Sequence, residues 1–176
     1  MDIKKLTLSA LAVAINIVFG TVIAMLNIPF LFLDMMGTIF ISAKYGMKYG
    51  IIVGLCTNLV LGIITGPTAI PFALVSIVGA IVVSVIARGT FGYKKAILTG
   101  ILLGIVCPLI GTPIRILLFG GLTGSGTDLI ISAFVASGKD IFSSVFISTV
   151  MANMIDKIVS CLIIAKVMEM TKKQLD

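Results

Sequence analysis

The sequence has 176 residues, of which 59% belong to hydrophobic types and 11% are charged, whereas soluble domains carry roughly 25% charged residues. With a mean hydropathy of +1.25, this composition predicts an all-α integral membrane protein, a single transmembrane domain over residues 1–176 with room for about six or seven spans. The formal charge of +6 is scattered between long apolar runs, so we attribute it to the positive-inside bias and expect no nucleic-acid partner.

Six transmembrane helices are expected in chain order. The first covers residues 6–26, and we interpret it as a retained helix because no small-residue cleavage site precedes a soluble domain. Asn27 and Pro29 should end it. The second segment, residues 30–43, carries Asp34 near its start and is short, so it would cross a bilayer only if tilted or tucked against its neighbours.

The remaining helices follow from breaks in longer apolar runs. Residues 49–87 are free of charge and too long for one span, and the glycine and prolines of residues 66–71 should divide them into the third and fourth helices. The fifth is expected over residues 96–119, kinked by two internal prolines. After a glycine-rich loop, the moderately apolar residues 129–149 lead to the sixth, which ends before residue 172.

The distribution of basic residues predicts the orientation. Six spans put both termini on one side, and if that side is the cytoplasm, ten basic residues lie inside and only Lys139 lies in an outer loop. The ten are Lys4, Lys5, Lys44, Lys48, Arg88, Lys94, Lys95, Lys166, Lys172 and Lys173. We therefore expect cytoplasmic termini, with outer loops after the first, third and fifth helices.

Four ionisable residues lie in or beside the expected spans: Asp34, Arg115, Asp156 and Lys157. Such a group costs about 2.5 to 3.5 kcal/mol to insert, so it tends to face a partner or a water-filled cavity. Arg115 follows Pro113, and its guanidinium could reach into an outward cavity or extend to the outer headgroups. Both interpretations of Arg115 stay open.

Asp156 and Lys157 are adjacent in sequence and so about 100° apart on a helix, which predicts that they do not pair with each other. Together with Asn153 and Ser160 they form a polar stripe on one face of the last helix. The stripe has three open interpretations. It could be a ligand-facing wall, an interfacial boundary if the last helix begins near Met154, or part of a buried ion pair with Arg115 or Asp34.

Small and amide residues add further candidates. Asn16 lies mid-helix and is expected to hold helices together, whereas Asn58 fits either that role or a ligand contact. Ala10 and Ala14 are four apart on one helical face, which lets another helix approach closely, within the same bundle or from a partner.

The sequence gives little support for catalysis. It has no histidine and no H-E-x-x-H, G-x-S-x-G or Walker A pattern, so we expect neither an enzyme nor an ATPase. The three cysteines, Cys56, Cys107 and Cys161, lie inside apolar stretches, which argues against disulfides and zinc. We expect no metal and no cofactor.

The chain resembles the substrate-binding S component of an energy-coupling factor (ECF) transporter. The resemblance lies in the six-span size, Ala10-x-x-x-Ala14, "AKYGMKYGIIVGLCTNLV", "GPTAIPFALVSIVGAIVV" and "NMIDKIVSCLI". It implies a bundle of that family in a bacterial or archaeal cell membrane, surrounded by lipid. It also implies that the chain captures a vitamin or related micronutrient outside and delivers it inward, together with a transmembrane coupling protein and two ABC-type ATPases.

The resemblance also assigns roles along the chain. It implies a lid in "LNIPFLFLD", a second wall in "TGPTAIP", and a contact of Ala10 and Ala14 with the coupling protein. The substrate-binding candidates are Asn153, Asp156, Lys157, Arg115, Asp34 and Asn58.

The identity of the vitamin stays open, and the absence of tryptophan departs from family members that stack their ligand on one. Two rival functions also remain. One is a stand-alone transporter driven by protons or sodium, with Asp34 or Asp156 carrying the charge. The other is a structural membrane protein that packs with partners through Ala10 and Ala14.

Overall fold

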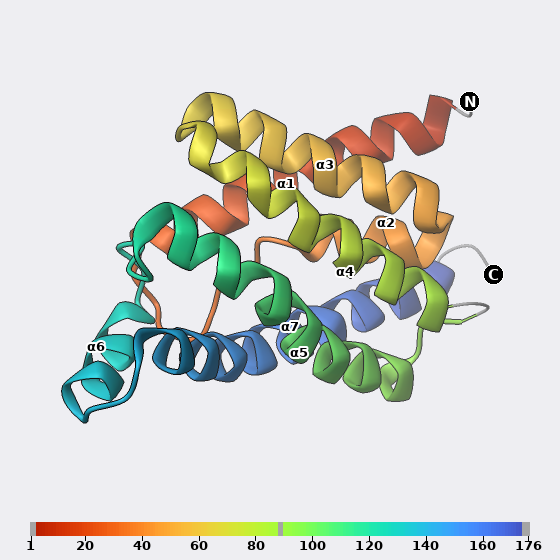
Figure 1. Cartoon of the computed structure of the whole chain (residues 1–176). Coiled ribbons are helices and arrows are strands. Elements are labelled where there is room, and N and C mark those ends of the chain that lie inside the picture. The colour runs from red at the N-terminus through yellow and green to blue at the C-terminus, as the bar shows by residue number, and fades with distance from the viewer. Residues whose placement is uncertain (1–2, 88–89, 174–176) are drawn as a thin grey trace.

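The computed structural model describes residues 3–87 and 90–173, and over these residues the chain is helical, with no strand (Figure 1). Its elements are α1 (Ile3–Met25), α2 (Met36–Tyr45), α3 (Met47–Ile64), the 3-10 helix η1 (Pro67–Phe72), α4 (Ala73–Ile86), α5 (Tyr93–Phe119), α6 (Asp128–Ala136) and α7 (Ile141–Lys173). Among the described residues, five helices are long and apolar enough to cross a membrane: α1, α3, η1 with α4, α5 and α7. The prediction of an all-helical protein with membrane-spanning helices is confirmed at this level.

The second expected helix is shorter than predicted. α2 has ten residues, so it extends for about 15 Å at 1.5 Å per residue, roughly half of a bilayer core of about 30 Å. It begins at Met36, and residues 26–35 before it are irregular. Asn27, Phe30 and Leu33 adopt positive φ angles of 49°, 66° and 51°, which a helix cannot contain.

The last helix is longer than predicted. α7 has 33 residues, and the amide of Ser143 donates to Asp140 Oδ2 at 2.8 Å, which caps the first turn. The interpretation that this helix begins near Met154 is therefore wrong, and Asp156 and Lys157 lie within it. α5 continues through both of its prolines, Pro108 and Pro113.

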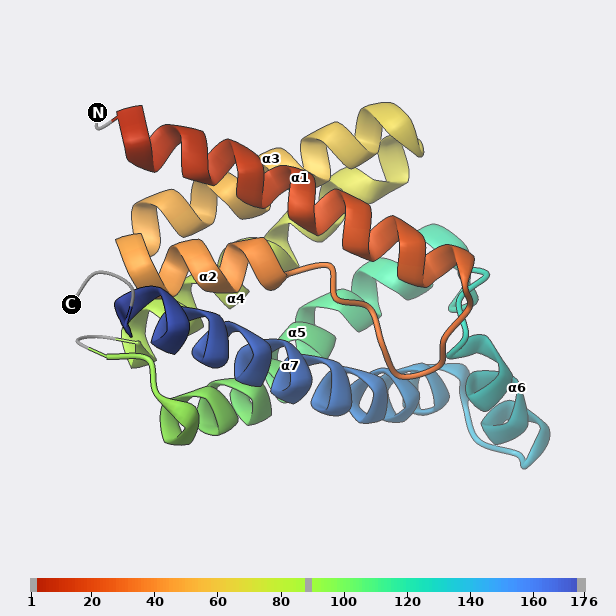
Figure 2. The ribbon, with the colours of Figure 1, turned by 180° about the vertical axis from the view of Figure 1, so that it is seen from behind.

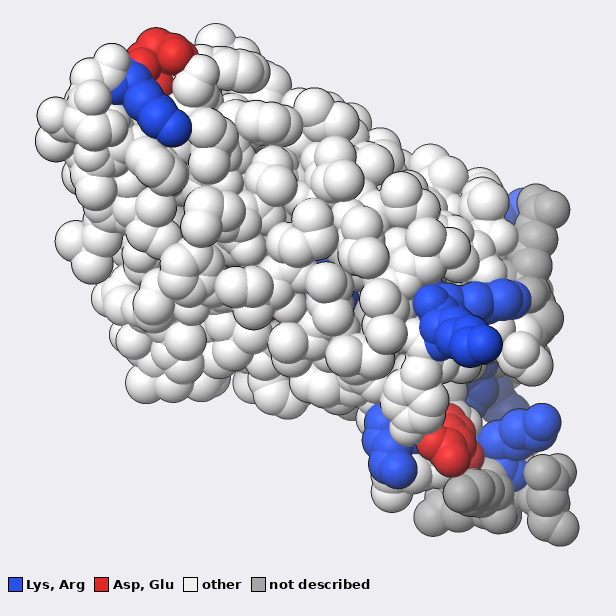
Figure 3. Space-filling view, turned by 90° about the horizontal axis from the view of Figure 1, so that it is seen from below, with Lys and Arg blue, Asp and Glu red and all other residues white. Residues whose placement is uncertain are grey.

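The helices run between two ends of a bundle (Figures 1 and 2). The first described residues of α1 and the last of α7 lie at one end, with the α2–α3 turn, the end of α4 and the start of α5. η1 and α6 lie at the other end, and residues 26–35 run from the end of α1 there toward the middle of the bundle, where α2 begins. Basic side chains gather at the end that holds the termini, and the face of the molecule seen in Figure 3 is almost free of charge between the two ends. Arg88, expected in this basic group, lies outside the described residues, and only the backbone of Lys173 is described.

Close backbone approach joins the elements that frame the interior. On α5, Gly100 and Gly104 face Ile158 and Met154 of α7, and a Cβ added at either glycine would lie within 3.0 Å of the α7 backbone. On α2, a Cβ added at Gly37 would lie 2.2 Å from the carbonyl oxygen of Ala12 on α1. These helices pack tightly because glycine leaves room for the neighbouring backbone.

Asn16 has the joining role expected for it. Its Nδ2 donates to Thr38 of α2 at 2.9 Å and to Thr57 of α3 at 3.1 Å, and its Oδ1 accepts from the amide of Gly37 at 2.7 Å. Ala10 and Ala14, in contrast, are exposed. They add little to packing within this bundle.

Candidate functional site

A cavity of about 470 Å³ lies near the end of the bundle opposite the termini. Its walls come from the irregular segment before α2, the end of α3, η1, the start of α4, α5, the α5–α6 loop and α7. A second cavity, of about 300 Å³, lies beside it against α1 and α3. The two share Phe32, Asp34, Thr65 and Ser125 as lining residues. We call these two spaces the ligand cavity and the side cavity.

A larger cavity, of about 660 Å³, lies at the basic end instead, where Tyr93 donates to Glu169 Oε2 at 2.8 Å. It borders residues 90–92, next to a stretch that the structure does not describe. We place the candidate site in the ligand cavity because three predicted site residues, Asp34, Arg115 and Asn153, line it.

The wall of the ligand cavity combines aromatic rings with small polar groups. Phe32, Phe72 and Phe119 line it, and the rings of Phe72 and Phe119 have centroids 6.4 Å apart. Hydroxyl groups come from Thr65, Thr68, Thr123, Ser125 and Thr149. Apolar walls with a few placed polar groups are typical of small-molecule sites.

A cluster of three charges lies at the inner side of this cavity. Lys157 Nζ lies 2.7 Å from Asp34 Oδ1 and 2.6 Å from Asp156 Oδ2. The prediction that Asp156 and Lys157 do not pair is therefore wrong. Their Cα–Cβ bonds do point in different directions, but the lysine stem is long and flexible enough to bring its ammonium group back to the neighbouring carboxylate. The open interpretation of an ion pair with Asp34 is the one observed.

Asp156 also holds the irregular segment against α7. Its Oδ1 accepts hydrogen bonds from the backbone amides of Phe32 and Leu33, both at 2.8 Å. The residue is fully buried, and both of its oxygens have partners. This carboxylate thus supplies the hydrogen bonds that the irregular backbone cannot make within itself.

Burial divides the cluster into an inner pair and an outer carboxylate. Asp156 and Lys157 are 0% and 2% exposed and lie behind the wall of the ligand cavity. The side chain of Asp34 is 51% exposed and lines both cavities. Of these three residues, Asp34 is the one in a position to meet a ligand directly.

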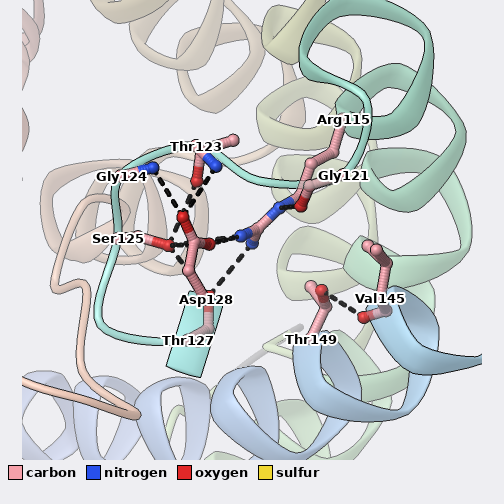
Figure 4. Close-up of polar contacts among 9 residues, drawn as sticks. All are labelled: Arg115, Gly121, Thr123, Gly124, Ser125, Thr127, Asp128, Val145 and Thr149. Atoms are coloured by element: carbon pink, nitrogen blue, oxygen red, sulfur yellow. Dashed lines mark hydrogen bonds and ion pairs between the residues drawn. The ribbon is translucent and has the colours of Figure 1, made fainter. Parts of the chain in front are cut away.

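Arg115 lies at the outer side of the ligand cavity and is engaged by the protein itself (Figure 4). Its Nε donates to the carbonyl oxygen of Gly121 at 2.7 Å, its Nη1 donates to Thr127 at 3.1 Å, and its Nη2 forms an ion pair with Asp128. The residue is only 7% exposed. It therefore does not extend to the outer headgroups.

Asp128, the partner of Arg115, is a residue near the site that sequence reasoning missed. Its Oδ2 accepts from the amides of Thr123 at 2.9 Å and Gly124 at 2.6 Å, which fixes the α5–α6 loop (Figure 4). The one available signal was an acid at the start of an apolar run, which is typical of a helix N-terminus. No periodicity links it to an arginine in the preceding helix.

The other predicted residues divide between the wall and the helix contacts. Asn153 lines the ligand cavity and donates to the carbonyl oxygen of Thr149 at 3.0 Å. Asn58 lies between α3 and α4, where its Nδ2 donates to Ser76 at 2.9 Å, and it is not among the lining residues of either cavity. Ser160 is buried, about one turn along α7 from Asp156 and Lys157. The described residues contain no group of three or more His, Cys, Asp or Glu side chains that could hold a metal ion.

Comparisons with protein-family models, curated proteins and solved structures give no match to this chain.

Proposed function

We propose that this chain is the substrate-binding S component of an ECF-type importer in a bacterial or archaeal cell membrane. In this role it captures a vitamin or related micronutrient from outside and delivers it inward. The observation that carries the proposal is the ligand cavity, which lies opposite the termini and beside an irregular segment tied down by Asp156. Such a segment suits a lid.

The proposal includes a six-span arrangement with cytoplasmic termini. Residues 26–45 act as the second crossing, half irregular chain and half α2. Irregular backbone is tolerated at membrane depth where protein buries it, and most of α2 is buried. Basic residues concentrate at the end that holds the termini, as expected for a cytoplasmic side (Figure 3).

Ala10 and Ala14 supply the partner surface in this proposal. Both are exposed on α1, where small side chains leave the backbone open to a second helix. The partners are a transmembrane coupling protein and two ABC-type ATPases, which would hydrolyse the ATP. The chain itself is then not an enzyme, and it needs no cofactor.

The partner surface is tested with Ala14→Trp. We expect this variant to keep its fold and lose co-purification with the coupling protein, because the indole would separate the two helices. Leu98→Trp is the matched control, since Leu98 is 51% exposed on a different helix, α5. Equal recovery of the coupling protein with both variants would remove Ala14 from the interface.

A second candidate, an ion-coupled transporter, is favoured by the charge cluster itself. Ionisable groups inside a membrane span often mark proton or ion pathways. Lys157 of α7 lies between the carboxylates of Asp34 and Asp156. Uptake into proteoliposomes separates the two functions. The S-component proposal requires uptake that depends on ATP, the coupling protein and the ATPases. Uptake by this protein alone, abolished by a protonophore, would establish the second candidate and refute the first.

A further inference from the structure

We propose that the ligand cavity selects a small organic cation with a flat or apolar body, and that Asp34 is the residue that binds its positive charge. This inference rests on the proposed function, because it names the chemical class of the solute that the S component would capture.

The charges around the cavity are the first argument. Asp34 and Asp156 carry two negative charges against the single positive charge of Lys157, so the cluster keeps one net negative charge. Both oxygens of Asp156 are engaged and the residue is fully buried, whereas Asp34 is 51% exposed and lines both cavities. The uncompensated charge is therefore presented at Asp34.

The positive groups near the cavity are not free for an anion. Arg115 forms an ion pair with Asp128 and donates to Gly121 and Thr127, so its charge is balanced within the loop. Lys157 is 2% exposed and already contacts two carboxylates. An anionic solute would have to displace one of these acids and would meet the negative charge of Asp34.

Helix ends of both polarities border the cavity. α3 ends at Ile64 and α5 ends at Phe119, and the adjoining Thr65 and Phe119 itself line the ligand cavity. A helix C-terminus carries a partial negative charge, equivalent to roughly half an elementary charge. α4 begins beside the same cavity, with Phe72 at its N-cap, and a helix N-terminus carries the opposite partial charge. The helix ends therefore do not decide the sign of the solute, which rests on Asp34 and the aromatic rings.

The aromatic residues complete the site. Phe32, Phe72 and Phe119 line the same space as Asp34. A cation that lies over the face of an aromatic ring is attracted by its quadrupole, most strongly where water is excluded. The rings would also cover the apolar body of the solute. A volume of about 470 Å³ is enough for a single-ring solute of vitamin size.

The test is a thermal-shift and calorimetric titration of the full chain in lipid nanodiscs at pH 7. The probes form three charge classes. The cationic probes are thiamin, pyridoxamine and choline, the neutral probes are pyridoxine, nicotinamide and riboflavin, and the anionic probes are nicotinate, pantothenate and biotin. Pyridoxamine with pyridoxine, and nicotinamide with nicotinate, share a ring and differ mainly in charge. Small molecules that co-purify with the protein are identified by mass spectrometry.

We expect stabilisation by one or more cationic probes only, or a co-purified cation. Asp34→Asn should weaken binding of that cation by about tenfold or more, because the charge is lost while the shape is kept. Asp34→Glu should restore most of the affinity. Asp140→Asn, which removes an exposed acid outside the cavities, is the matched control and should bind like the wild type.

The outcomes separate the two proposals. Binding of a neutral or anionic probe with equal or higher affinity, or a co-purified anion, overturns the cation inference and leaves the S-component function standing. Unchanged cation affinity in a folded Asp34→Asn variant also overturns the inference. If no probe binds and nothing co-purifies, both proposals fall. If Asp34→Asn does not fold, the matched probes decide, and equal affinity for pyridoxamine and pyridoxine overturns the inference.

Discussion

Replacement of Lys157 by methionine is the sharpest test of the charge cluster. The methionine side chain follows the path of the lysine stem and fills similar space, but it removes the ammonium group. Asp156 would then keep its hydrogen bonds from Phe32 and Leu33 but lose its counter-charge while fully buried. Asp34 would lose its partner as well, although it is half exposed and can be hydrated.

The expected cost follows from burial. Removing one partner of a buried ion pair typically destabilises a protein by about 3 to 5 kcal/mol. We take the lower end, about 3 kcal/mol, because water can solvate Asp34. For a domain of this length, 1 kcal/mol shifts the midpoint by about 2 to 4 °C. Lys157→Met should therefore lower the thermal midpoint by about 10 °C.

The cysteines provide the assay. Cys107 and Cys161 are buried, so a thiol-reactive fluorescent dye reports their exposure as the detergent-solubilised protein unfolds. Lys166→Met is the matched control, since Lys166 is exposed on the same helix and carries the same charge. We expect the control to stay within about 2 °C of the wild type, as surface substitutions usually do. If Lys157→Met is no less stable than Lys166→Met, the argument that Lys157 compensates buried charge is refuted.

Three further predictions concern the framework of the site. Asn16→Leu should lower the free energy of unfolding by about 2 kcal/mol or more, because the amide of Gly37 loses its buried acceptor. A thermal midpoint equal to that of the wild type in the same dye assay would contradict this reasoning. Gly37→Ala should strongly reduce the yield of folded protein, since the new Cβ would lie 2.2 Å from the carbonyl oxygen of Ala12, whereas Gly92→Ala, with open space around it, should leave the yield unchanged. Asp128→Asn should speed hydrogen exchange in residues 121–127, measured by mass spectrometry, because the ion pair with Arg115 is lost; an exchange rate equal to that of the wild type would show that the loop holds its shape without this charge.

The helices that local chemistry specifies could be predicted from the sequence. α1, α3, α4 and α5 begin and end within a few residues of the expected positions, because apolar run length and the Gly and Pro breaks are local signals. α2 could not be predicted in the same way. Residues 30–35 have the composition of a helix, but their irregular conformation depends on Asp156, more than 120 positions away in the chain.

The partners of the site residues likewise depend on contacts between residues that are distant in the sequence. The cost of burying charge identified Asp34, Arg115, Asp156 and Lys157 as residues that need partners, and each of them has one. Which partner each acquires depends on tertiary contacts, as the pairing of Arg115 with Asp128 shows. The angular rule that separated Asp156 from Lys157 describes Cβ directions and applies best to short side chains, whereas a lysine ammonium can reach a neighbouring carboxylate.

The cluster also connects the irregular segment to the cavity that it borders. Asp34 belongs to this segment and pairs with Lys157, while the preceding backbone amides of Phe32 and Leu33 bond to Asp156. A solute that binds Asp34 therefore meets the same segment that α7 holds in place through two adjacent residues. That segment also lines both cavities. A substitution that weakens the hydrogen bonds between Asp156 and the segment should therefore change solute affinity and segment mobility together. Substitutions at Asp156 and at Asp34 are then expected to be non-additive in both measurements.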